Sequence, residues 1–171
     1  FLIGYLDESI QIDDKFPCIS YEAELANFEA LALYILSRDD ACLCLKPQFH
    51  RNSAKVIFHR SHYLKLLIQN DKLIEYFTDN TPGNARNNLL PSYAFQDVDL
   101  CIGSCLGGTA AYECASINIR TVLIHANTFY TPFNKYPFAG KVLFSDINEL
   151  ISTLSDIKTK SQFYDSDLGT W

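Results

Sequence analysis

The chain has 171 residues, of which 48% are hydrophobic and 20% charged, and its formal net charge is -6. This length suits one domain with a sizeable core, and the acidic balance argues against broad electrostatic binding to nucleic acid. No apolar run reaches the roughly 18 residues that a membrane-spanning helix requires. The chain has no initiator methionine and no secretory signal pattern, so we expect a portion of a longer protein and not a secreted precursor.

The first half of the chain predicts two strands and two helices. Residues 1–6 are apolar and strand-like, whereas the apolar side chains of 21–38 fall on one helical face, with acidic residues early, as the helix dipole favours. A short buried strand follows over 41–45. Residues 59–77 are predicted to be helical, with an interruption near residue 70.

The second half continues the alternation, with a short strand over 89–90 and a brief helix starting at Pro91. Further strands are predicted over 99–103, 121–125 and 141–144, and further helices over 109–117 and after Asp146. We expect Asp146 to cap the last helix and Glu149 to complete a capping box. This alternation implies right-handed βαβ units. The prediction is therefore an α/β fold, one Rossmann-like, doubly wound domain over 1–171, with a mainly parallel sheet and helices on both faces.

The most informative segment is 99–113, where an apolar strand enters a loop of small residues that opens a helix. Gly107 and Gly108 carry no Cβ, so backbone N–H groups can approach an anion, and the helix start adds its positive dipole end. Thr109 and Glu113 are four residues apart and share a helix face. The layout is typical of a phosphate or nucleotide site, although it matches neither GxGxxG nor the Walker pattern.

A plain strand-to-helix turn is the alternative interpretation of this segment. Thr109 would then be the N-cap, and Glu113 would complement the helix dipole. A ligand site in a doubly wound sheet lies beyond the carboxyl ends of the strands. The residues that the predicted strands bring to that edge are Asp7, Lys46, Ser104 and His125.

Disulfide and metal chemistry find little support in the sequence. The six cysteines form no CxxC pair, and those in or beside apolar segments favour buried free thiols in a reducing cytoplasm. His59 and His62 stand three apart on a predicted helix, but no third ligand is recognisable nearby. We therefore expect no metal site.

Several stretches resemble the donor-binding half of GT-B glycosyltransferases, especially bacterial enzymes of surface-polysaccharide biosynthesis such as those of capsule and lipopolysaccharide. The central block is similar to the run that lines the nucleotide-sugar pocket of that family, and it comprises 97–104, 108–113 and 121–124. Residues 44–48 resemble a strand-end K-P-H segment, and 167–171 resemble the L-G-x-W tail of polysaccharide-biosynthesis proteins.

The resemblance implies a domain that binds a nucleotide sugar, such as a CMP- or UDP-sugar, as substrate, without a cofactor or a metal. It implies that Glu113 binds the ribose hydroxyls. The residues implied at the phosphate and the departing nucleotide are Gly103, Ser104, Gly107, Gly108, Thr109 and Lys46, with Gln48 or His50. Gln48 stands where the family pattern has histidine, and His50 is the alternative. The usual glycine-proline turn before the next strand is replaced by Asn118, Ile119 and Arg120. Arg120 is therefore either a surface residue or a phosphate contact.

In this family the catalytic base lies in the other domain, so the glycan acceptor would bind to a preceding domain or a partner chain, unless Asp7 or Glu8 supplies the base. Catalysis would come from charge stabilisation on the leaving phosphate by the helix dipole and a cation. The resemblance implies a cytoplasmic protein, with peripheral association of the longer chain at the inner face of the membrane.

Three alternatives stay open at this point. The chain could be the nucleotide-sugar-binding subunit of a split glycosyltransferase, inactive without its partner. It could also be a sugar-nucleotide epimerase or hydrolase of the same fold. A non-catalytic ligand-sensing domain is the third, because a fold does not decide a function.

Overall fold

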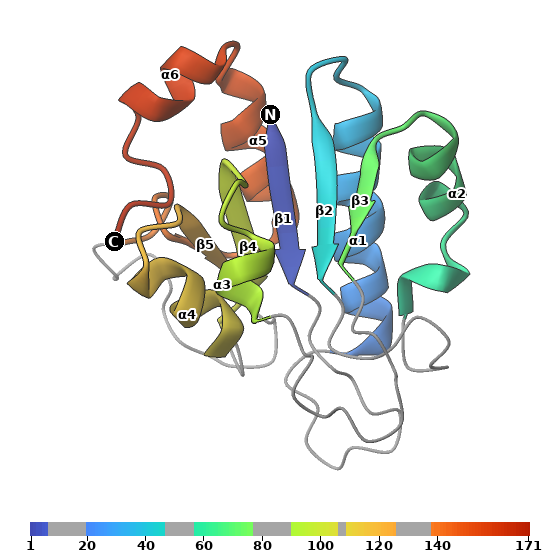
Figure 1. Ribbon diagram of the computed structural model, residues 1–171, viewed down its shortest axis with the longest axis horizontal. Helices are drawn as coiled ribbons and strands as arrows, with labels where there is room; N and C mark the ends of the chain where they lie inside the picture. Colours follow the sequence, from blue (N-terminus) through green and yellow to red (C-terminus); the bar gives the residue numbers. More distant parts are fainter. Residues whose placement is uncertain (7–19, 47–56, 77–89, 106–108, 126–137) are drawn as a thin grey trace.

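The computed structural model describes residues 1–6, 20–46, 57–76, 90–105, 109–125 and 138–171. Within these residues, parallel strands form one six-stranded sheet in the order β3-β2-β1-β4-β5-β6 (Figure 1). The strands are β1 (Leu2–Leu6), β2 (Cys42–Lys46), β3 (Leu73–Glu75), β4 (Leu100–Ser104), β5 (Thr121–Ile124) and β6 (Leu143–Phe144). The predicted Rossmann-like α/β fold is confirmed.

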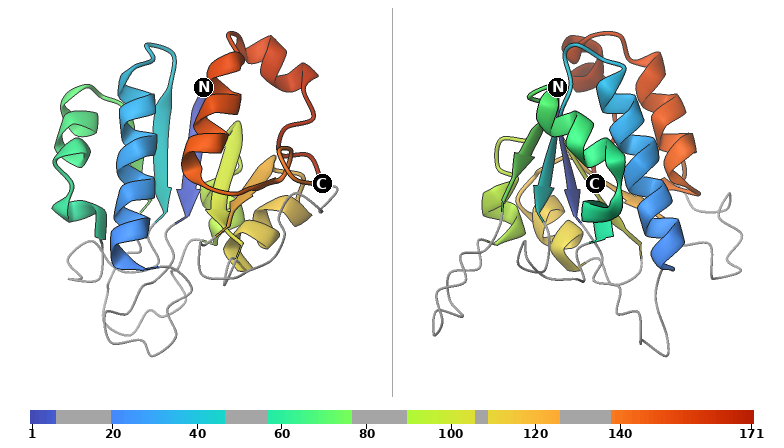
Figure 2. Two further views of the ribbon diagram at one scale, coloured as in Figure 1. Left: turned by 180° about the vertical axis from the view of Figure 1, so that it is seen from behind. Right: turned by 90° about the vertical axis from the view of Figure 1, so that its right-hand side faces the viewer.

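Helices cover both faces of this sheet, as the side view in Figure 2 shows. One face carries α1 (Tyr21–Leu36) and α5 (Ile147–Asp156), which contact each other, and α2 (His62–Gln69) with the short helix η1 (Ile57–Arg60) beside α1. The other face carries α3 (Pro91–Ala94) and α4 (Thr109–Ser116). A further helix, α6 (Lys160–Asp165), lies near the amino ends of the strands (Figure 1).

The central strands are buried on both sides, so their sequences are continuously apolar. Successive side chains point to opposite faces. Leu43 and Leu45 of β2 therefore join the large core beneath α1 and α5, whereas Cys44 joins the smaller core beneath α3 and α4. Both cores continue across β1, β4 and β5, which holds the strand ends in register.

Two glycines let the helical layer approach the sheet closely on the α3 and α4 side. A Cβ on Gly103 would lie 2.6 Å from the Cβ of Ala111, and a Cβ on Gly4 would lie 2.7 Å from the ring of Phe95. Neither position has room for a side chain. Gly103, which the family resemblance implied at the phosphate site, thus has a direct structural role, because it lets α4 lie against β4.

The C-terminal residues close the amino edge of the sheet beside β5. Leu168 is buried, and Gly169, with φ of 72°, accepts a hydrogen bond from Thr121 N–H (2.8 Å) and donates one to the Lys141 carbonyl (2.9 Å). The Trp171 indole donates to the Thr121 carbonyl at 2.8 Å. The L-G-x-W-like tail therefore has a structural explanation in this chain.

Most predicted elements are confirmed to within one or two residues, but the helix expected over 59–77 is wrong at its end. Asp71, with φ of 54°, follows the end of α2, and Leu73–Glu75 pairs with β2 as the edge strand β3. This strand exists because a neighbour pairs with it, which no local pattern reveals. The strand expected over 89–90 is not formed at Leu90, which precedes α3, while residue 89 lies outside the described residues.

The caps of the two C-terminal helices, α5 and α6, differ in part from the expected ones. Asp146 caps α5 as predicted, since its carboxylate accepts from the N–H groups of Asn148 and Glu149. The capping box is wrong, because Glu149 accepts from Ser145 N–H (2.7 Å) and not from the N–H of Asp146. A true capping box forms instead at the start of α6, between Thr159 and Gln162.

Candidate functional site

The candidate site lies where the direction of winding changes in the sheet. β1 and β4 are hydrogen-bonded neighbours, yet α1, which follows β1, and α4, which follows β4, cover opposite faces. In doubly wound sheets, ligands bind beyond the carboxyl ends of the strands at such a point. Of the expected site residues, those outside the described part of the chain are Asp7, Glu8, Gln48, His50, Gly107 and Gly108.

Helix α4 supplies two of the expected residues on one face. Thr109 is its first residue and is exposed, and Glu113, one turn later, is half-buried. Within the described residues, the Thr109 hydroxyl has no hydrogen-bond partner. The first N–H groups of a helix have no partner inside it, so the start of α4 offers both N–H donors and the positive dipole end to an anion.

The Glu113 carboxylate is held from one side by α3. Its Oε1 accepts two hydrogen bonds from Ser92, one from the backbone N–H at 3.1 Å and one from the side-chain hydroxyl. Its Oε2 accepts none from any residue that the structure describes. Glu113 therefore links α4 to α3 and keeps one acceptor oxygen unused, and its expected contact with ribose stays a prediction.

Lys46 and Ser104 end β2 and β4, on either side of β1. Register pairs Lys46 with Leu6 at the end of β1. Two strand spacings put β2 and β4 about 10 Å apart. Successive side chains of a strand point to opposite faces of the sheet, so Lys46 lies on the same face as Cys44. This is the face that α4 covers. Both side chains are buried and already have interaction partners, so a ligand here would meet a cation and a hydroxyl that are held in place.

His125 follows β5 at the same edge of the sheet. Its backbone N–H donates to the Phe144 carbonyl at 2.8 Å, which continues the pairing of β5 with β6 beyond the last strand residue. The side chain is half-buried and has an interaction partner. Lys46, Ser104 and His125 were predicted to lie at the carboxyl edge of the sheet. The structure confirms this position, since they end β2, end β4 and follow β5.

Arg120 is half-buried and lies at the amino edge, away from the expected phosphate site. Its guanidinium donates to four backbone carbonyls that end α6 and begin the tail, namely those of Phe163 (3.2 Å), Tyr164 (2.8 Å), Ser166 (2.9 Å) and Leu168 (3.1 Å). The last carbonyls of a helix lack partners within it, and a cation there is favourable. Arg120 precedes β5, at the amino edge, and is thus a structural residue far from the carboxyl edge.

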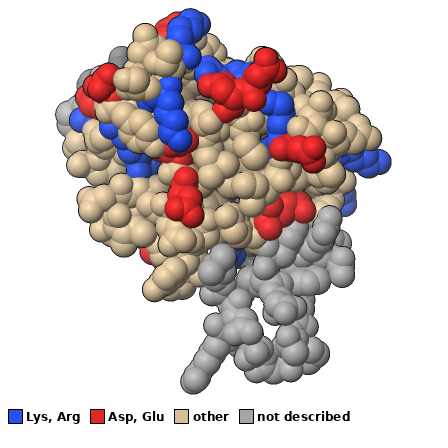
Figure 3. Space-filling model, turned by 45° about the horizontal axis from the view of Figure 1, so that its top comes forward, with Lys and Arg blue, Asp and Glu red and all other residues tan. Residues whose placement is uncertain are grey.

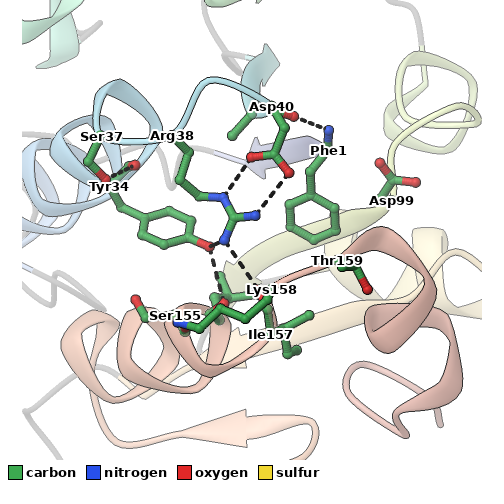
Figure 4. A network of polar contacts seen from close by, with 12 residues as sticks. Phe1, Tyr34, Ser37, Arg38, Asp40, Asp99, Ser155, Ile157, Lys158 and Thr159 are labelled. Carbon is green, nitrogen blue, oxygen red and sulfur yellow. Dashed lines mark hydrogen bonds and ion pairs between the residues drawn. The ribbon is translucent and has the colours of Figure 1, made fainter.

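The amino edge carries a network of polar side-chain contacts (Figure 4). The guanidinium of Arg38 forms a two-pronged ion pair with Asp40 (2.8 and 2.9 Å) and also donates to the Tyr34 hydroxyl and the Ile157 carbonyl. Figure 3 shows cationic and anionic side chains interspersed on this face. These groups pair with one another, so they offer little to a ligand. The contact between Arg38 and Ile157, 119 residues apart, has no local signature in the sequence.

Asp99 is the second anchor of this edge. It is only 4% exposed and accepts from Leu2 N–H (2.8 Å), from the Lys160 ammonium (2.8 Å) and from the Tyr164 hydroxyl. Burial raises the pKa of the Asp99 carboxyl, but the hydrogen bonds from Lys160, Tyr164 and Leu2 outweigh burial and lower it below its ordinary value. The carboxylate thus joins β1 to α6.

The described cysteines are all unpaired, and three of them, Cys44, Cys101 and Cys114, are buried. Burial raises the pKa of Cys44 to about 12 and also raises that of Cys105, the thiol at the carboxyl edge. A raised pKa disfavours the nucleophilic thiolate. The described ranges contain no group of three or more potential metal-binding side chains, and His59 and His62 fall on separate helices, η1 and α2.

Comparison with models of protein families, with curated proteins and with solved structures finds no match for this chain. Among the described residues, no helix has the length and apolar character needed to span a membrane.

Proposed function

We propose that this chain is the donor-binding domain of a GT-B glycosyltransferase of bacterial surface-polysaccharide synthesis, and that it binds the nucleotide of an activated sugar. The observation that carries the proposal is the placement of Thr109 and Glu113. Thr109 begins α4, the helix that follows β4 at the switch point of the sheet, and Glu113 lies one turn further along it. Each keeps an oxygen without a partner among the described residues. The proposal also draws on the family resemblance of the central block.

In this proposal each group at the edge has a distinct role. The N–H groups at the start of α4, with the Thr109 hydroxyl, bind the phosphate, and Lys46 adds a positive charge from the end of β2. Glu113 accepts hydrogen bonds from the ribose hydroxyls. The phosphate-binding donors stabilise the charge that develops on the leaving phosphate, which is the main catalytic contribution available from this domain.

The acceptor side of the reaction is assigned to another domain or chain. We propose that the glycan acceptor and the catalytic base are supplied there, so that the described domain alone binds the donor but does not transfer the sugar. We further propose a cytoplasmic site of action, with the longer protein associated peripherally with the inner face of the membrane.

The test is a calorimetric panel of CMP, UDP, GDP and their sugars against the chain. We expect weak binding of one nucleotide class, and we expect Thr109→Ala to weaken it by about 0.5–1.5 kcal/mol through loss of one hydroxyl contact. Thr153→Ala on α5 is the matched control, because it removes a hydroxyl that bonds only its own helix, at the Glu149 carbonyl. Absence of any response at millimolar nucleotide would overturn the proposal.

A further inference from the structure

Ser92 is the second residue of α3, and it is 8% exposed. Both of its polar hydrogens are donated to the same atom, Oε1 of Glu113 on the neighbouring helix. A glutamate side chain has several rotatable bonds, and its terminal torsion is broad, so an unrestrained carboxylate samples many orientations. Two donors on one oxygen restrict that motion and leave Oε2 with no hydrogen-bond donor among the described residues.

The two hydrogen bonds have separable roles. Pro91 has no N–H and begins α3, and Leu90 provides no side-chain cap, so the Ser92 N–H is one of the helix N–H groups that need an acceptor from outside. Glu113 supplies that acceptor, which stabilises α3. The Ser92 hydroxyl is not needed for this stabilisation, because any residue at position 92 other than proline keeps the backbone N–H.

We propose that the Ser92 hydroxyl is a positioning group that orients Glu113 so that Oε2 accepts hydrogen bonds from the ribose hydroxyls of the nucleotide. This inference rests on the proposed function. Ser92 acts through Glu113, so its contribution depends both on the presence of that carboxylate and on the presence of the ribose hydroxyls. A hydroxyl that merely stabilised α3 through Glu113 would depend on the carboxylate but not on the ribose hydroxyls.

The test compares nucleotides with and without ribose hydroxyls. The affinities of CMP, UDP and GDP, each beside its 2′,3′-dideoxy form, are measured by calorimetry for the wild-type chain and for Ser92→Ala. We expect Ser92→Ala to weaken the bound ribonucleotide about tenfold, in line with one lost hydrogen bond to a charged group. We expect its affinity for the dideoxy form to stay within about twofold of the wild type, within the error of such comparisons.

Two further variants isolate the mechanism. In a double-mutant cycle, Ser92→Ala should have no further effect on ribonucleotide affinity once Glu113→Ala is present, because the group it positions is gone. Ser116→Ala is the matched control, because the Ser116 hydroxyl donates to the backbone carbonyl of Glu113 at 2.7 Å and leaves the carboxylate untouched. We expect the affinity of this control to equal that of the wild type.

The outcomes separate the inference from the function on which it rests. A wild-type chain that binds none of the nucleotides overturns both. If the wild type binds and Ser92→Ala loses affinity for the ribonucleotide and the dideoxynucleotide equally, the positioning role alone is overturned. Unchanged affinity in Ser92→Ala, or effects of Ser92→Ala and Glu113→Ala that simply add, also overturn it. Thermal melts of each variant verify that the compared proteins are folded.

Discussion

The two carboxylate oxygens of Glu113 differ in what they bind. Oε1 accepts from Ser92 on α3, whereas Oε2 has no acceptor role among the described residues. Glu113 lies four residues after Thr109, and this spacing predicted a shared helix face and a ligand contact. The spacing did not indicate the contact between Glu113 and α3. A single side chain thus joins two helices through one oxygen, while the other oxygen has no partner among the described residues.

At this scale we predict that Glu113→Ala weakens nucleotide binding by about 1.5–3 kcal/mol, because hydrogen bonds to a charged acceptor are lost. The variant should also melt somewhat earlier, since the Ser92 N–H loses its acceptor. Calorimetry with the nucleotide that binds the wild type, together with thermal melts, measures the two effects. Asp156→Ala on α5, at an exposed site, is the control.

The opposite pattern would assign Glu113 to the fold alone. A variant that melts much earlier and yet binds nucleotide with wild-type affinity would identify Glu113 only as the residue that caps α3. The ribose role would then fail, and the positioning role of Ser92 would fail with it.

At the scale of elements, the start of α4 is positioned by how closely the helix meets the sheet. A Cβ at position 103 would lie 2.6 Å from the Cβ of Ala111, far inside normal contact distance. The glycine in β4 therefore controls where the first turn of α4, with Thr109, sits relative to the strand end.

We predict that Gly103→Ala destabilises the fold by about 1–3 kcal/mol, the usual effect of overfilling a core, and weakens nucleotide binding by displacing α4. Urea unfolding and calorimetry measure the two losses. The double variant Gly103→Ala with Ala111→Gly removes the clashing Cβ, so it should regain nucleotide affinity, although glycine inside a helix costs about 1 kcal/mol of stability. Equal affinity in wild type and Gly103→Ala would show that the α4 position does not govern binding.

Across the molecule as a whole, the two edges of the sheet have different roles. Arg120, Asp99 and the C-terminal tail hold the amino edge together through hydrogen bonds that join β1, β5 and α6. The carboxyl edge carries Lys46, Ser104, Thr109 and His125. The contacts that hold the amino edge together are thus separate from the groups of the proposed site, which lie at the opposite edge.

This division predicts a pH dependence of stability. The pKa of Asp99 is lower in the folded chain than its ordinary value, so its stabilising contribution is fully present above the ordinary carboxyl pKa of about 3.9 and is lost as pH falls through the lower, folded value. The difference in unfolding free energy between wild type and Asp99→Asn should therefore be larger at pH 7 than at pH 3. Urea titrations at the two pH values measure it, with Asp156→Asn as the control.

A difference between wild type and Asp99→Asn that is the same at pH 3 and pH 7 would contradict this assignment. It would mean that the charge of Asp99 does not matter and that its shape and neutral hydrogen bonds account for the effect. Nucleotide affinity should be unchanged in Asp99→Asn, because Asp99 precedes β4 at the amino edge and the proposed site follows that strand.

Local sequence patterns were enough to predict the α/β class and most of the strands and helices. They also predicted that Lys46 and Ser104 lie at the carboxyl edge of the sheet. The signals are apolar runs, helical periodicity and capping residues within a few positions of one another. Strand β3 depends instead on tertiary structure, since its three residues form a strand because β2 pairs with them. The partners of Glu113, 21 residues away, and of Arg120, up to 48 residues away, also emerge only in the folded chain, because such long-range contacts have no period and no local signature.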